Sequence, residues 1–218
     1  MRGITGRAPD PGTQPWSTGI VSMHARTRLA AIVTLLAAMP ACTEPAATET
    51  SADDGGMPVQ PRQLVDAYAW VTAPAERDAF VAAKPQSVEC PPVDGFGAVD
   101  FGGYPAFEVH TDFCDYITVE QPLGDDVDAG EYVNVRMWHF DLLAAEPATG
   151  YAAVAEAGTV RWEYETPIPA DGALASYGWI TDEPIAAGTF VQFHVHNHGI
   201  NSWNLIEITA EPGEQAPG

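Results

Sequence analysis

Hydrophobic and polar residues alternate strictly between Val191 and His196, within a longer stretch at 190–198. Side chains of an extended strand point to opposite faces with a period of two, so Val191, Phe193 and Val195 share one face. The opposite face then carries a histidine at every second position, namely His194, His196 and His198. The pattern predicts a strand with one face in a hydrophobic core and the other face lined by imidazoles.

Similar alternating stretches follow one another from residue 90 onward, separated by Gly, Pro and Asp. They predict strands at 105–110, 113–119, 132–142, 152–156, 159–165, 177–181, 190–198 and 203–209. About eight short strands with no helix between them predict an all-β fold, an antiparallel β-sandwich with a jelly roll as its candidate arrangement. Ahead of them we expect a short helical or irregular lead-in, in which Pro74 and the acidic residues after it favour a short helix that ends at Lys84-Pro85.

The amino-terminal part of the chain carries the features of an export signal. A short basic region precedes an apolar run over 29–39, which is too short to span a bilayer but matches the core of a signal peptide. The run ends in Met-Pro-Ala-Cys at Cys42, which resembles the signal of bacterial lipoproteins, whose cysteine is acylated and becomes the first mature residue. The resemblance implies a lipid anchor at Cys42 and, with Thr43 next, sorting to the outer membrane of a Gram-negative cell. The alternative is an ordinary signal peptide cleaved near Ala41, which would leave Cys42 free.

Composition divides the rest of the chain. Residues 42–60 contain few large apolar side chains and cannot offset the entropy of ordering, so they predict a flexible acidic tether. We expect an upstream extension and signal peptide at 1–41, a lead-in segment at 61–89, the β-sandwich at 90–212 and a disordered tail at 213–218.

The charge balance restricts the partners. The chain has 30 acidic and 9 basic residues and a formal net charge of −21. Phosphate binding needs a basic surface, so nucleic acid is excluded as a partner. The expected partners are a membrane, through the lipid anchor, and a small ligand, a glycan or a protein.

The chain contains three cysteines. If Cys42 is acylated, Cys90 and Cys114 remain as a pair in an oxidising compartment. A disulfide between them would contribute about 3 kcal/mol to stability.

The histidine strand is also a candidate metal site. Imidazoles at i and i+2 lie roughly 6.6 Å apart along a strand and can lean onto one ion, at about 2.0–2.1 Å each. The candidate ligands for zinc or copper are His194 with His196, or His196 with His198, completed by His110, His139, Asp112 or Asp141. The alternatives are solvent-facing histidines that bind carboxylates, and a pH-responsive surface.

One short match names an enzyme family. The sequence Gln-Phe-His-Val-His at 192–196 resembles the zinc strand of α-carbonic anhydrases, in which both histidines bind the metal. The resemblance implies zinc on His194 and His196, with a bound water of lowered pKa. That family takes its third histidine ligand from a later strand, and this chain has no histidine after His198.

Three functions remain open from the sequence. The first is an exported, lipid-anchored β-sandwich that binds a transition metal through the histidine strand. The second is a small zinc- or copper-dependent enzyme with Asp112 or Asp141 as base; binding is favoured over catalysis because no recognisable set of acid and base groups accompanies the histidines. The third is a carbohydrate-binding or purely structural surface lipoprotein, in which Trp138 and Trp203 would stack on a ligand if they are exposed rather than buried.

Overall fold

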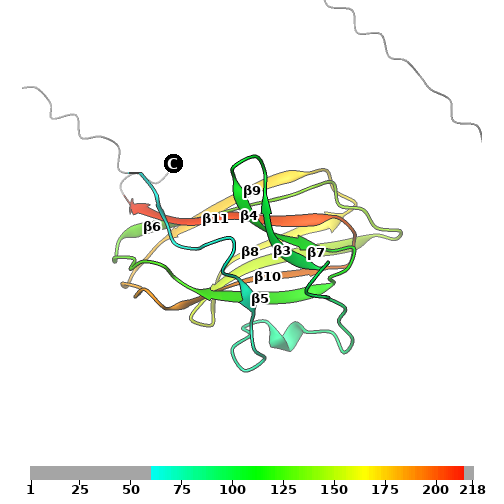
Figure 1. The fold of residues 1–218 in the computed structure, drawn as a ribbon, viewed down its shortest axis with the longest axis horizontal. Coiled ribbons are helices and arrows are strands. Elements are labelled where there is room, and N and C mark those ends of the chain that lie inside the picture. Colours follow the sequence, from blue (N-terminus) through cyan, green and yellow to red (C-terminus); the bar gives the residue numbers. More distant parts are fainter. Residues whose placement is uncertain (1–59, 214–218) are drawn as a thin grey trace, which may run out of the picture. The chain divides into compact units, whose positions relative to one another are not determined.

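The computed structural model describes residues 60–213, which form two antiparallel β-sheets (Figure 1). The six-stranded sheet has the order β3 (Phe96–Asp100), β4 (Pro105–His110), β11 (Ser202–Pro212), β6 (Glu131–His139) and β9 (Ala173–Ile180), with β1 (Arg62–Gln63) also paired to β11. The five-stranded sheet has the order β2 (Val71–Thr72), β5 (Tyr116–Pro122), β10 (Phe190–Asn197), β7 (Ala148–Glu156) and β8 (Thr159–Ile168).

The sheet order confirms the predicted sandwich and its jelly-roll arrangement. Strands β4, β11, β6 and β9 form one sheet, and β5, β10, β7 and β8 form the other. Consecutive strands therefore lie in opposite sheets over much of the chain, as in a double-sheet jelly roll. Each of the eight strands expected from the sequence corresponds to one of β4 to β11, with boundaries that differ by up to four residues.

Alternation along the central strands builds the core. On β6 the buried residues Val133, Val135 and Met137 alternate with Asn134 and Arg136, which are partly exposed. On β10 the residues Val191, Phe193 and Val195 enter the same core cluster, together with residues of both sheets. Each sheet consequently has one inward face and one outward face, and the outward face of β10 carries His194 and His196.

The lead-in segment is irregular, the second of the two forms expected for it, and not α-helical. The chain after Pro74 forms turns and a single 3-10 turn, η1 (Val81–Ala83), rather than a helix that runs up to Lys84-Pro85. The same segment supplies β1 to one sheet and β2 to the other. Within the described residues, no helix is long and apolar enough to cross a membrane.

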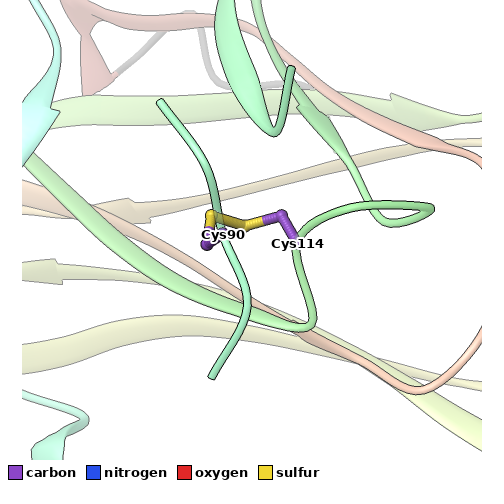
Figure 2. Close-up of a disulfide and its surroundings, with 2 residues drawn as sticks. All are labelled: Cys90 and Cys114. Carbon is purple, nitrogen blue, oxygen red and sulfur yellow. A yellow bond between two sulfur atoms is a disulfide. The ribbon is translucent and has the colours of Figure 1, made fainter. Parts of the chain in front are cut away.

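A disulfide joins Cys90 to Cys114, as predicted, with a Cα–Cα distance of 4.0 Å (Figure 2). It connects the end of the lead-in segment to the residues just before β5. The predicted signal peptide, the acylated Cys42 and nearly all of the expected tether and tail fall in residues 1–59 and 214–218, outside the described part of the chain.

Candidate functional site

The histidine strand is β10, the central strand of the five-stranded sheet, and its imidazoles are on the outward face as predicted. His194 is nevertheless only 1% exposed. The ring of Phe80, just before η1, stacks on its imidazole with centroids 4.3 Å apart and planes 13° apart. Tyr116 and Tyr151 pack against the same imidazole edge-on, at 4.7 and 5.7 Å. The innermost histidine is therefore enclosed by aromatic rings.

This environment keeps His194 neutral. Burial lowers its pKa to about 4, and the nearby carboxylate of Asp78 offsets only part of that effect. Its Nδ1 lies 2.9 Å from the hydroxyl oxygen of Thr118, and its Nε2 has no hydrogen-bond partner in the protein. Burial also lowers the pKa of His196, and neighbouring His198 lowers it further. The predicted hydrogen bond between a strand histidine and a carboxylate is replaced at His194 by one to a hydroxyl group.

Several polar contacts hold the lead-in segment over these histidines. The Tyr116 hydroxyl donates to Asp78 at 3.1 Å, and the backbone N–H of Ala79 donates to Gln192 at 3.0 Å. Arg77 forms an ion pair with Glu120, whose carboxylate is buried. The outward face of the five-stranded sheet is thus occupied around His194 by the protein's own chain.

The other proposed metal ligands lie elsewhere. His110 is at the end of β4, on the outward side of the six-stranded sheet, where it contacts Glu108 at 2.7 Å. His139 points into the core, with Nδ1 2.8 Å from the Phe140 carbonyl and Nε2 3.2 Å from the Tyr164 hydroxyl. Among residues 60–213, no group of three or more His, Cys, Asp or Glu side chains is placed to hold a metal ion. The fold therefore places His110 and His139 apart from the histidines of β10.

The two proposed carboxylates do not join the histidine strand either. Asp112 is exposed in the turn that follows β4. Asp141 follows β6 and accepts a hydrogen bond from the backbone N–H of Gly172 at 2.7 Å. In the described part of the chain, neither carboxylate joins the strand histidines in a group of three or more metal-binding side chains.

The two tryptophans proposed to stack on a ligand differ in exposure. Trp203 is fully buried, packs on the imidazole of His139 and belongs to the core. It is not available to a ligand. Trp138 lies on the outward face of β6, in the phase of Asn134 and Arg136, and is partly exposed.

Trp138 belongs to an aromatic surface on the six-stranded sheet. Its ring centroid lies 4.5 Å from that of Phe140 and 5.2 Å from that of Phe101, which comes from the turn between β3 and β4. Phe140 is 39% exposed and Leu174, opposite Trp138 on β9, is 60% exposed. These apolar side chains lie on the surface of a strongly acidic protein.

The aromatic surface borders a hollow of about 590 Å³, lined by Trp138, His139, Phe140, Asp141, Gly172, Ala173, Leu174, Asn201 and Ile206. Its rim is polar. The Asn201 amide donates to the Asp141 carbonyl at 2.7 Å, which joins the β11 end of the hollow to the β6 end. The arrangement offers a small ligand ring-stacking surfaces with a carboxylate and an amide beside them.

Sequence reasoning missed Phe101, Leu174 and Ile206. Phe101 lies outside the predicted strands, so alternation could not place it. Ile206 is the extra residue of a β-bulge, because Leu205 and Glu207 pair with the adjacent residues Met137 and Arg136. The sequence signal for this bulge is a pair of successive apolar residues, Leu205 and Ile206, which interrupts the alternation.

Comparison with known proteins assigns no family. No protein-family model matches the chain, and no curated protein matches it. Among solved structures, a family 11 carbohydrate-binding module from Clostridium thermocellum, in complex with a β-1,3-1,4-mixed-linked tetrasaccharide, has 10% identity and a TM-score of 0.39, over 70% of this chain and 96% of that one. The module CBM28, specific for non-crystalline cellulose, has 10% identity and a TM-score of 0.41, over 72% and 95%. The mannan-recognising module TmCBM27 has 7% identity and a TM-score of 0.38, over 65% and 96%. Similarity at this level is too distant to assign a function to the chain.

Proposed function

We propose that this protein binds a carbohydrate on the outward face of the six-stranded sheet. The observation that carries the proposal is the exposed aromatic surface of Phe101, Trp138 and Phe140 beside the hollow of about 590 Å³. A contiguous exposed apolar patch on a soluble domain marks a binding site. A hollow of this volume is within the range of ligand sites, which combine apolar walls with a few polar groups.

The chemistry of the hollow fits a sugar better than a purely apolar ligand. A pyranose ring has a face of C–H groups that packs on an aromatic ring, and hydroxyl groups at its edge. Trp138 and Phe140 supply the aromatic packing, and Asp141 and Asn201 supply hydrogen-bonding groups at the rim. The ligand would bind as a ring stacked on the sheet with its hydroxyls toward the rim.

Charge favours a neutral glycan. The chain carries a net charge of −21, and Asp141 adds a carboxylate to the hollow. Arg136, on the same face, is paired with Glu207 at 2.8 Å. A uronic acid polymer would meet an unfavourable field, so neutral polysaccharides are the expected ligands.

We also propose that the domain is exported and lipid-anchored through Cys42, which would hold the glycan site at an outer-membrane surface. This proposal rests on the apolar run and the cysteine motif of the sequence. The predicted tether at 42–60 would give the domain reach from the membrane.

The binding test uses affinity gel electrophoresis in gels that contain mixed-linkage β-glucan, xylan, galactomannan or polygalacturonate. We expect at least one neutral polysaccharide to retard the wild-type protein, and polygalacturonate not to. Trp138→Ala and Phe140→Ala should each weaken the affinity by about tenfold, because each removes an aromatic stacking surface and a loss of about 1.4 kcal/mol is a tenfold change in affinity.

The matched control is Phe190→Ala. Phe190 is 39% exposed, as Phe140 is, but it lies on β10 of the other sheet. It should leave binding unchanged. Equal retardation of wild type and Trp138→Ala would contradict the proposed site, and no retardation in any of the gels would contradict the proposed function.

A further inference from the structure

Four polar side chains lie in a row beside the aromatic surface, on the outward face of the six-stranded sheet. Glu108 and His110 are on β4, and Ser202 and Asn204 are on β11, in register with each other as His110 with Ser202 and Glu108 with Asn204. We call these four residues the polar row. Alternate residues of both strands, such as Val109, enter the core, so the polar row faces outward.

The polar row is linked internally. The His110 Nε2 lies 2.7 Å from the Glu108 carboxylate, and the His110 Nδ1 lies 3.4 Å from the Ser202 hydroxyl. Asn204 has no such partner. Its side chain is 0% exposed, and neither its amide nitrogen nor its amide oxygen has a hydrogen bond within the protein. Buried amides are nearly always paired, and leaving one unpaired costs free energy.

The polar row is continuous with the proposed glycan site. Asn204 pairs with Trp138 on its other side, in the same register position across β11 and β6. One row further along, the Phe140 backbone N–H donates to the Ser202 carbonyl at 3.3 Å. A ring stacked on Trp138 would therefore lie next to β11 at the position of Asn204.

The turn that carries Phe101 lies over the strand of Asn204. The hairpin of β3 and β4 lies on one side of β11, while Trp138 lies on the other side, in β6. Phe101 touches Trp138, so the hairpin turn must pass over β11, the strand that carries Asn204. Figure 1 shows this hairpin crossing β11.

The turn that carries Phe101 contains two consecutive glycines with positive φ. Gly102 and Gly103 adopt φ values of +72° and +97°, a region that glycine enters without strain, and a Cβ at either residue would meet no atom within 4 Å. The turn is closed by its own hydrogen bonds, from Phe101 N–H to the Tyr104 carbonyl and from Gly103 N–H to Asp100.

We propose that Asn204 is the specificity-determining residue of the glycan site, and that the Phe101 turn is a flap that opens to let a sugar reach it. An amide donates and accepts at once, so it recognises two neighbouring hydroxyl groups, one as acceptor and one as donor. The Glu108 carboxylate beside it accepts from a hydroxyl and repels a sugar acid. The inference rests on the proposed function and names its ligand class, a neutral sugar with a vicinal diol at the edge that points along β11.

The first test separates binding from stability. Asn204→Leu keeps the size of the side chain but removes both polar atoms. It should leave the melting temperature unchanged or raise it, because no hydrogen bond of the fold is lost, and should weaken binding to the retarding polysaccharide by about tenfold or more. Asn134→Leu is the matched control, since Asn134 is on the same face of β6 and its side chain is paired with Ser176 instead. It should leave binding unchanged.

The second test addresses the flap. Asp100→Ala removes the carboxylate that accepts from Gly103 and should loosen the turn, which should speed association with the polysaccharide-derived oligosaccharide in stopped-flow tryptophan fluorescence.

A fall in the melting temperature of Asn204→Leu would mean that the amide is structural and would overturn the inference without any ligand. Full binding by Asn204→Leu, with binding lost in Trp138→Ala, would also overturn it while the proposed function stands. Loss of retardation for wild type in every gel would overturn both.

Discussion

His194 shows how far a single side chain can depart from the behaviour that its sequence context indicates. A histidine in an alternating strand of an acidic protein is expected to be solvated, to titrate near its ordinary pKa, or to bind a metal. The stacked ring of Phe80 and the edges of Tyr116 and Tyr151 exclude water from it. The result is a neutral imidazole that serves packing.

The lowered pKa predicts a pH dependence of stability. The pKa of His194 is about 4 in the folded protein and about 6.5 in the unfolded chain, so the unfolded chain binds more protons between these values. The His194 contribution is complete at neutral pH and is lost as the pH falls from about 6.5 to 4. Between pH 7 and pH 5 this loss amounts to about 2 kcal/mol.

Urea unfolding at pH 7 and pH 5 measures this effect as a difference between variants, which cancels the titration of the many carboxylates. His194→Leu should lose about 2 kcal/mol less than wild type over this interval. Phe190→Leu is the control and should behave as wild type, because Phe190 lies on the same strand, is 39% exposed and has no ionisable group. Identical losses in wild type and His194→Leu would show that His194 titrates normally.

Among the elements, the lead-in segment covers the outward face of the five-stranded sheet around His194. Its polar anchors are Arg77 on Glu120, Asp78 on Tyr116 and the backbone of Ala79 on Gln192. Its apolar anchor is Phe80, which is buried and packs with Tyr116 and Ala153. The disulfide at Cys90 fixes the end of the segment to the start of β5.

Phe80→Ala tests whether this cover acts as a unit. Truncation of a buried phenylalanine costs about 3 kcal/mol or more. The variant should lose this amount in urea unfolding, and NMR titration should show the His194 pKa rising from about 4 toward its ordinary value as water enters. Val81→Ala, one residue further along and exposed, is the control and should change neither quantity. A stability loss without any rise in the pKa would mean that Phe80 does not cause the burial of His194.

The elements also show what a single sequence can reveal. The eight longer strands were predictable because residues such as Val191, Phe193 and Val195 alternate over enough positions to define a face. Two-residue strands such as β1 have no period to detect. The helix expected after Pro74 did not form because Asp78 and Arg77 satisfy tertiary partners on β5, and such contacts override local propensity.

The candidate site was less predictable than the fold, for a physical reason. Trp138 was identified, because an aromatic residue on the outward phase of a strand is visible in the pattern. Phe101 and Asn204 could not be identified, because Phe101 reaches Trp138 only when the β3–β4 turn passes over β11 in the folded sheet. The period of a strand predicts the face on which a residue lies, but it does not predict which residues of other strands lie beside it.

The whole molecule presents two outward faces with opposite properties. The face of the five-stranded sheet carries the histidines and is covered around His194 by the lead-in segment. The face of the six-stranded sheet carries an open hollow of about 590 Å³ with aromatic walls. A ligand for this domain is therefore expected on the six-stranded sheet, and the most conspicuous motif of the sequence lies on the other side.

The position of the ligand site can be tested by NMR titration with an oligosaccharide derived from the polysaccharide that retards the protein. We expect chemical-shift changes to concentrate on the Trp138 indole and on the backbone amides of Leu174 and Asn201, with the amides of His194 and His196 unchanged. Shifts that concentrate on the histidine strand instead, with the Trp138 indole unmoved, would contradict it and place the binding site on the opposite sheet.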